Sequence, residues 1–240
     1  CGRKSVYLSI YLKKKFSNII NIHIQNPKIS SKNFSFIIAP NHDSYSGENV
    51  INSIGALHYF KERDNYKFNF ENNNLVSCII GGENNHYTFS LKEAQYLCNK
   101  IYELKKNNSG LKFLIITSRR TNYQIKELIK KRLSKICEIW VGKGKNPYKF
   151  ALYNSKFFII TSDSTSMISE ASISRMPIYV FQLPFKRKSE RLNRFHNEFR
   201  RLNITRDLIS TKNLENWSYA KIDESKRIAG IIKKRIIERF

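Results

Sequence analysis

Residues 157–170 hold the side chains best suited to bind a phosphate and a sugar ring. An apolar run, 157–161, ends in small polar residues: Ser162, Asp163, Ser164, Thr165 and Ser166. A helical pattern with one acid, Glu170, follows. The free N–H groups and positive dipole of a helix N-terminus favour phosphate, and Glu170 could accept hydrogen bonds from ribose. The alternative is a structural junction in which Asp163 or Ser164 caps the helix and Glu170 is solvated.

Two further predicted strands end in residues suited to phosphate. Gly81 and Gly82 follow the run 76–80 and would let the backbone approach a ligand. Ser118, Arg119 and Arg120 follow the run 112–117, where a guanidinium can hold diphosphate and stabilise a leaving group. A tight turn and two solvated arginines are the alternatives.

Two segments offer weaker signals. Asn146 and Tyr148 flank Pro147 and could form part of a base pocket, or only the cap and first turn of a helix. Arg194 and His196 lie in a basic helical stretch, from which they could reach the ligand or remain on the surface.

His42 and Asp43 close the apolar run 34–39. A histidine beside a carboxylate after a strand can act as a general base. Adjacent residues do not usually face each other, so a polar turn is the alternative. The sequence contains no P-loop, Gly-x-Ser-x-Gly elbow, His-Glu-x-x-His or complete Gly-x-Gly-x-x-Gly, so nothing supports an ATPase, hydrolase, metalloprotease or dehydrogenase.

The chain of 240 residues has a formal net charge of +24 and a pI of about 9.9. Such a charge favours anionic partners: nucleotide phosphate, anionic lipid or nucleic acid. Because Lys, Asn and Ile recur everywhere, we ascribe about half of the excess to compositional drift. Nucleic acid is not an expected partner, since no recognition motif is present and the aromatic residues fall in core-like runs. No apolar run is long enough to span a bilayer.

The four cysteines are far apart and have no histidine at ligand spacing. A zinc site is therefore not expected, and the pattern fits a reducing compartment. Cys78 and Cys137 lie in strand-like runs and are predicted to be core residues. Cys1 would fit a processed lipoprotein, but truncation is the simpler interpretation of a start without methionine.

Short apolar runs alternate with helical patterns along the chain. This order predicts parallel sheets covered on both faces, with polar side chains gathered at the carboxyl ends of the strands. The residues 71–74 are the best linker candidate. Strands are expected at 19–24, 34–39, 76–80, 112–117, 137–141, 157–161 and 178–181, and a short extended stretch at 56–60. Helices are expected at 6–15, 91–106, 123–133, 147–154, 165–175, 189–202 and 223–240.

Together these motifs resemble the mitochondrial fission ELM1-like family, whose bacterial members resemble GT-B glycosyltransferases. The matching positions are 1–3, 39–43, 49–50, 55–58, 81–82, 117–121, 146–148, 161–171, 177–181 and 194–196. The resemblance implies an α/β fold of two Rossmann-like domains, with a truncated N-terminal domain that lacks a first strand and glycine-rich loop. We expect an acceptor-side domain at 1–73, a nucleotide-sugar domain at 74–222, and a C-terminal helix, 223–240, that packs back on the first domain.

The resemblance also implies a transfer reaction and its partners. The donor would be a nucleoside diphosphate sugar, bound by the polar residues of the second domain, with His42 or Asp43 as the acceptor base. No metal or other cofactor is expected, since no Asp-x-Asp motif is present. A lipid-linked acceptor and a cytoplasmic location at the inner face of an anionic membrane are expected. The alternative is a non-catalytic adaptor that binds an anionic membrane surface through the basic residues of 186–201 and 226–239.

Overall fold

The computed structural model describes residues 3–16, 18–60 and 74–238. The chain divides into two compact units. Unit 1 comprises Cys1–Tyr59 with Ile222–Phe240, and unit 2 comprises Phe60–Lys221. The contact boundary thus follows residue 59, whereas the sequence places it after residue 73. Residues 71–73 of the predicted linker lie outside the described part of the chain.

Unit 1 is a small parallel sheet between two helices. Its strands are β1 (Ile22–Ile24), β2 (Phe36–Pro40) and β3 (Val50–Ser53), paired in that order. The helix α1 (Arg3–Lys15) covers one face of the sheet, where Val6 packs with Ile37 and Val50. The helix α7 (Glu224–Ile237) covers the other, where Ile228 packs with Phe36. Because successive strand residues point to opposite faces, the apolar run of β2 fills both cores.

Polar contacts attach α7 to β3 although the two lie far apart in the sequence. The Glu224 carboxylate accepts a hydrogen bond from the N–H of Ile54 at 2.8 Å. The Arg227 guanidinium donates to the carbonyl of Asn52 at 2.6 Å. The C-terminal helix therefore belongs to the same unit as the N-terminal strands.

Gly230, in the interior of α7, allows the stability of this helix to be tested. Gly230 is exposed, and a Cβ added there meets nothing within 4 Å. Glycine is about 1 kcal/mol less favourable than alanine inside a helix. We therefore expect Gly230→Ala to raise the free energy of unfolding by about 0.5–1 kcal/mol, measured by urea denaturation. A loss of stability would contradict the open helix surface described here.

Unit 2 is a six-stranded parallel sheet. The strands are β4 (Leu75–Ile80), β5 (Lys112–Thr117), β6 (Glu138–Trp140), β7 (Ser155–Thr161), β8 (Ile178–Phe181) and β9 (Thr205–Asp207). Their order is β6-β5-β4-β7-β8-β9, and all neighbours are parallel. The order reverses between β4 and β7. In open α/β sheets, ligands bind outside the carboxyl ends of the strands at such a point.

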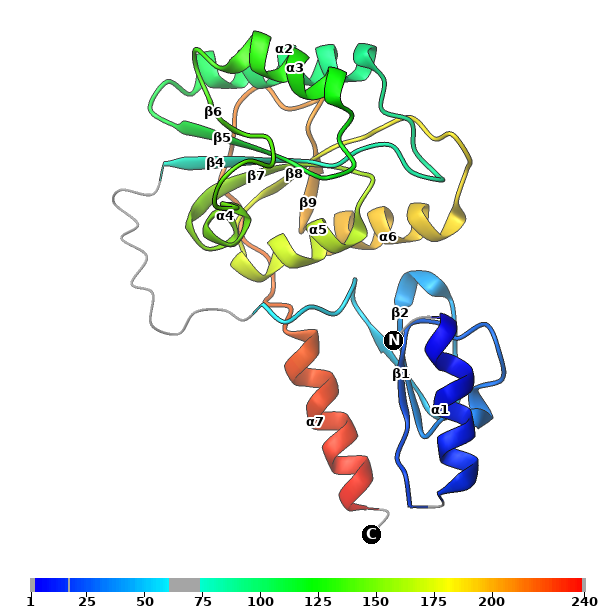
Figure 1. The fold of residues 1–240 in the computed structure, drawn as a ribbon. Helices are drawn as coiled ribbons and strands as arrows, with labels where there is room; N and C mark the ends of the chain where they lie inside the picture. Colours follow the sequence, from blue (N-terminus) through cyan, green and yellow to red (C-terminus); the bar gives the residue numbers. More distant parts are fainter. Residues whose placement is uncertain (1–2, 17, 61–73, 239–240) are drawn as a thin grey trace. The chain divides into compact units, whose positions relative to one another are not determined.

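Helices cover both faces of this sheet (Figure 1). One face is covered by α2 (Leu91–Asn107) and α3 (Tyr123–Leu133), the other by α4 (Tyr148–Asn154), α5 (Thr165–Ala171) and α6 (Glu190–Arg201). Leu97, Ile101 and Ile129 pack on the buried strand residues of the main core. The helix α2 begins with a capping box between Ser90 and Glu93, which satisfies N–H groups that the helix itself leaves free.

Several elements differ from the sequence-based prediction. The expected helix 165–175 ends at Ala171 and continues as a 3₁₀ turn, Ser172–Ser174, because Arg175 takes the left-handed conformation with φ 61°. Residues 56–60, expected to be short and extended, form no strand in the described structure, and the strand expected at 19–24 is confined to β1. The strands β3 and β9 were not predicted, since four and three residues give too short a pattern. Of the helices described, none has the length and hydropathy that crossing a bilayer requires.

Candidate functional site

A cavity of about 660 Å³ lies in unit 2 at the carboxyl ends of β4, β5 and β6. This volume is typical of small-molecule sites, which span roughly 300–1,000 Å³. We call it the sheet-edge cavity. Its apolar lining consists of Ile79, Ile116, Trp140, Val141 and Met167, and its remaining lining of Thr117, Ser118, Arg119, Lys126, Gly142, Asn146, Tyr148 and Glu170. Residues from six separate segments thus meet at one place.

Five of the predicted site residues line the cavity: Ser118, Arg119, Asn146, Tyr148 and Glu170. The sequence did not identify Trp140, Val141 or Lys126 as site residues. The first two lie in the predicted strand 137–141, and in the structure β6 is an edge strand of the sheet, whose end is open to the cavity. Nothing in the sequence marked Lys126 as a site residue except its position, one turn into the helix that follows Arg119.

Glu170 and Tyr148 form the polar centre of the cavity. The Tyr148 hydroxyl donates a hydrogen bond to the Glu170 carboxylate. Burial raises the pKa of Glu170 above its ordinary value, and the bond from Tyr148 opposes this shift. A half-buried carboxylate held by a tyrosine is well placed to accept hydrogen bonds from a hydroxylated ligand. The Asn146 side chain meanwhile accepts a bond from the Tyr148 N–H at 2.9 Å, so it also orders the start of α4.

Arg119 and Lys126 supply positive charge to the same cavity. Neither side chain makes a hydrogen bond or an ion pair to any residue in the described ranges. Both are positioned by one junction, where the Asn122 side chain caps α3 by accepting from the Gln124 N–H at 2.8 Å. The cavity therefore contains two cations without partners and one carboxylate, an arrangement that favours a ligand with more than one negative charge.

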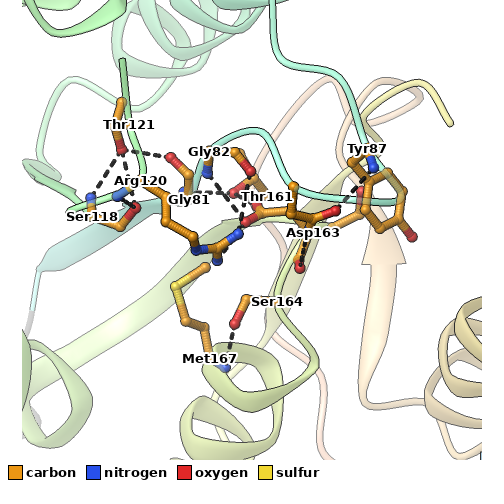
Figure 2. Close-up of polar contacts among 12 residues, drawn as sticks. Gly81, Gly82, Tyr87, Ser118, Arg120, Thr121, Thr161, Asp163, Ser164 and Met167 are labelled. Carbon is orange, nitrogen blue, oxygen red and sulfur yellow. Dashed lines mark hydrogen bonds and ion pairs between the residues drawn. The ribbon is translucent and has the colours of Figure 1, made fainter. Parts of the chain in front are cut away.

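Arg120 makes an ion pair within the described part of the protein, which Arg119 does not. Its guanidinium lies 2.7 Å from the carboxylate of Asp163, whose side chain is fully buried (Figure 2). The same carboxylate accepts hydrogen bonds from the Gly82 N–H at 3.1 Å and from the Thr161 hydroxyl at 2.6 Å. We call these contacts the Asp163 clasp. They join the loops after β4, β5 and β7 and neutralise the Arg120 charge within the protein.

The two predicted glycines belong to this clasp and do not line the cavity. A Cβ on Gly81 would lie 2.1 Å from the Asp163 carboxylate oxygens, and a Cβ on Gly82 would lie 2.2 Å from the Arg120 carbonyl oxygen. Real Cβ atoms do not approach other atoms so closely. Glycine is thus required here by contacts between protein loops, which figure 2 shows around Thr121 and Asp163.

The hydroxyl residues after β7 also bond to the protein, and none of them lines the cavity. The Ser162 hydroxyl accepts from the Leu183 N–H at 2.9 Å. The Ser164 hydroxyl caps α5 by accepting from the Met167 N–H at 3.4 Å. Thr165 and Ser166 form the first turn of α5. In this structure the segment thus serves chiefly to position Glu170.

The remaining predicted residues lie elsewhere. His196 is buried, with its Nε2 at 3.2 Å from the Tyr87 hydroxyl and 3.1 Å from the Ser162 carbonyl. Arg194 is exposed on the same helix. His42 is buried in unit 1 with its Nε2 at 3.9 Å from the Asp43 carboxylate. Within the described ranges, no group of three or more His, Cys, Asp or Glu residues could hold a metal ion.

Comparisons with known proteins agree with this architecture. The family model described as "Mitochondrial fission ELM1" matches residues 1–236. An uncharacterized protein of Rickettsia prowazekii (strain Madrid E) is 30% identical over 288 aligned positions, covering 97% of this chain and 77% of its own length. The Mitochondrial fission protein ELM1 of Arabidopsis thaliana is 23% identical over 274 positions, covering 100% of this chain and 63% of its own length.

Solved structures show the fold. The UDP-GlcNAc 2-epimerase of Methanocaldococcus jannaschii, solved in complex with UDP-GlcNAc and UDP, aligns with a TM-score of 0.51 at 13% identity, covering 97% of this chain and 72% of that one. MurG of Acinetobacter baumannii aligns with a TM-score of 0.50 at 9% identity, covering 87% and 66%. The predicted fold class, Rossmann-like units of the GT-B type, is confirmed.

Proposed function

The chain belongs to the mitochondrial fission ELM1 family, and from this premise we propose that unit 2 binds a nucleoside diphosphate sugar for transfer to an acceptor. The observation that supports the proposal most is the sheet-edge cavity, which combines a half-buried carboxylate with two cations that no described residue pairs. A nucleoside diphosphate has matching parts: a ribose with hydroxyl donors and two linked phosphates.

Each part of the ligand has suitable residues in the cavity. Glu170 would accept hydrogen bonds from the ribose hydroxyls. Arg119 and Lys126 would bind the diphosphate. Trp140 and Val141 offer an apolar wall for the base, since bases bind well against flat apolar side chains.

The same cations would assist the transfer. When the bond between sugar and diphosphate breaks, negative charge grows on the leaving phosphate. Fixed positive groups at that point stabilise the charge without a metal ion. Arg120 is not assigned this role, because Asp163 already neutralises it. His42 and Asp43 remain the proposed acceptor bases, from unit 1.

Isothermal titration calorimetry with UDP, GDP, ADP and their sugar conjugates tests the donor site. Charge-assisted hydrogen bonds contribute about 1.5–3 kcal/mol, so Arg119→Ala should weaken the preferred diphosphate about tenfold or more. Lys131→Ala is the matched control, because Lys131 lies on α3, the helix that follows Arg119, but does not line the cavity. Absence of binding by any nucleotide, or equal affinity in the Arg119 variant, would refute the proposal.

A non-catalytic adaptor is the second candidate. The Arabidopsis relative is named a mitochondrial fission protein, and the net charge of +24 favours an anionic partner. The two candidates differ in one measurement. Release of nucleoside diphosphate from a sugar donor, lost in the Arg119 variant, would support transfer. Nucleotide binding without turnover, on any acceptor supplied, would favour the adaptor.

A further inference from the structure

The helix α1 has two distinct faces. Val6 is buried against the sheet of unit 1, and Ile10 packs beside it. These two residues are four apart, as expected for one face of a helix. The opposite face is not polar, as an outward face normally is.

That outward face is an exposed stripe of large side chains. Tyr7, Leu8 and Tyr11 are 71%, 60% and 57% exposed. Tyr11 lies four residues after Tyr7 and three after Leu8, which places it beside both on the helix surface. Phe16, just beyond the helix, is also exposed. We call Tyr7, Leu8 and Tyr11 the α1 stripe.

Lysines border the stripe. Lys4 precedes Leu8 by one turn, and Lys15 follows Tyr11 by one turn, so each lies on the same side of the helix. The Lys15 ammonium is 5.9 Å from the Tyr11 ring centroid and 5.5 Å from that of Phe16. Lys14 is exposed beside them.

The surrounding sequence has basic but no acidic residues. Seven basic residues precede the first acidic residue, Asp43: Arg3, Lys4, Lys13, Lys14, Lys15, Lys28 and Lys32. A surface of tyrosine, leucine and lysine with no carboxylate on its helix is complementary to negative charge over an apolar layer. Anionic lipid headgroups above acyl chains have this composition.

We propose that the α1 stripe docks unit 1 on an anionic lipid bilayer. Tyrosine rings lie well at the level of the headgroups, and the leucine inserts below them. The lysines extend their apolar stems along the rings and keep their ammonium groups at the phosphates.

The stripe differs from the other basic helices. No large exposed apolar side chain is found on α6 among the described residues, and α7 exposes only Ile237. Those helices can add long-range attraction, but α1 alone of the three combines charge with more than one large exposed apolar side chain. The proposed docking surface therefore lies on α1, and not on α6 or α7, whose basic residues the sequence analysis suggested for membrane binding.

Sedimentation of the full chain with vesicles tests this inference. We expect binding to phosphatidylcholine vesicles that contain phosphatidylglycerol and little binding to phosphatidylcholine alone. Since each basic residue near such a surface contributes about fivefold in affinity, Lys14→Gln with Lys15→Gln should lower the partition coefficient about 25-fold. Replacing Tyr7, Leu8 and Tyr11 by Ser should lower it about tenfold or more, also at high salt.

Matched variants in unit 2 provide the controls. Tyr102→Ser with Tyr123→Ser removes equally exposed rings, and Lys131→Gln with Lys135→Gln removes equal charge. Both pairs should leave vesicle binding unchanged. Nucleotide affinity should be unchanged in every stripe variant, so this test is independent of the donor-site proposal.

A spectroscopic measurement covers the case in which the triple variant fails to fold. The emission of Tyr11→Trp should shift to the blue with anionic vesicles and not with neutral ones. The proposal is overturned if that emission does not shift, if neutral and anionic vesicles bind equally, or if the unit 2 lysine pair matters as much as Lys14 and Lys15. Self-association through the stripe without vesicle binding would also overturn it.

Discussion

Glu170→Gln is expected to weaken nucleotide binding by about tenfold or more at pH 7 while leaving the ligand-free protein at least as stable as before. A hydrogen bond to a charged group contributes about 1.5–3 kcal/mol, and a ribose offers two hydroxyl donors to one carboxylate. Glutamine keeps the shape of the side chain and can still accept the hydrogen bond from Tyr148. Calorimetry measures the affinity, and thermal melting measures the stability.

The pH dependence of stability tests whether burial of the ionised Glu170 carboxylate causes this difference in stability. Burial raises the pKa of Glu170 in the folded protein. As the pH rises from the ordinary glutamate range through that raised pKa, the folded state holds more protons than the unfolded state, so stability falls. Above the raised pKa the loss is complete and constant. The Gln variant lacks this loss, so its stability advantage should be absent in acid and appear as the pH increases.

The affinity of the wild-type protein should change in the opposite direction. The ionised carboxylate is the better acceptor for ribose, so nucleotide binding should strengthen as Glu170 loses its proton. The Gln variant should show no such rise. Tyr148→Phe is the matched control: it removes the bond that opposes the shift, so the rise in affinity should move to higher pH. An affinity that is the same for wild type and Gln variant would remove Glu170 from the site.

The sequence predicted the architecture of unit 2 well because its signals are local. Each buried strand is a short apolar run, and each is followed by a helical pattern. Cys78 as a core residue follows from the same patterns. Glu170 and Arg119 were identified because parallel strands bring their carboxyl ends to one edge.

Pairing between distant residues could not be predicted from those patterns. Nothing in the sequence distinguishes Arg119 from Arg120, yet the first lines the cavity and the second binds Asp163. The difference depends on how closely the loops after β4 and β7 approach each other. Likewise, Trp140 became a lining residue because β6 is an edge strand, and strand order is a property of the whole sheet.

The Asp163 clasp makes Gly82 intolerant of any side chain. We expect Gly82→Ala to lower the free energy of unfolding by about 3 kcal/mol, at the upper end of the usual cost of overpacking. The added Cβ would lie 2.2 Å from the Arg120 carbonyl oxygen, and backbone atoms cannot rotate away as the end of a side chain can. Urea denaturation measures the loss.

Gly110→Ala is the matched control for this prediction. A Cβ at Gly110 meets nothing within 4 Å, so the substitution should change stability by less than about 1 kcal/mol. Because the Gly82 variant must displace the backbone of Arg120, it should also displace its neighbour Arg119 and weaken diphosphate binding. Weaker diphosphate binding in this variant would show that the Asp163 clasp fixes the position of Arg119 in the cavity. If Gly82→Ala proves as stable as Gly110→Ala, the close approach of the two loops is wrong, and the different roles of the two arginines lose their basis.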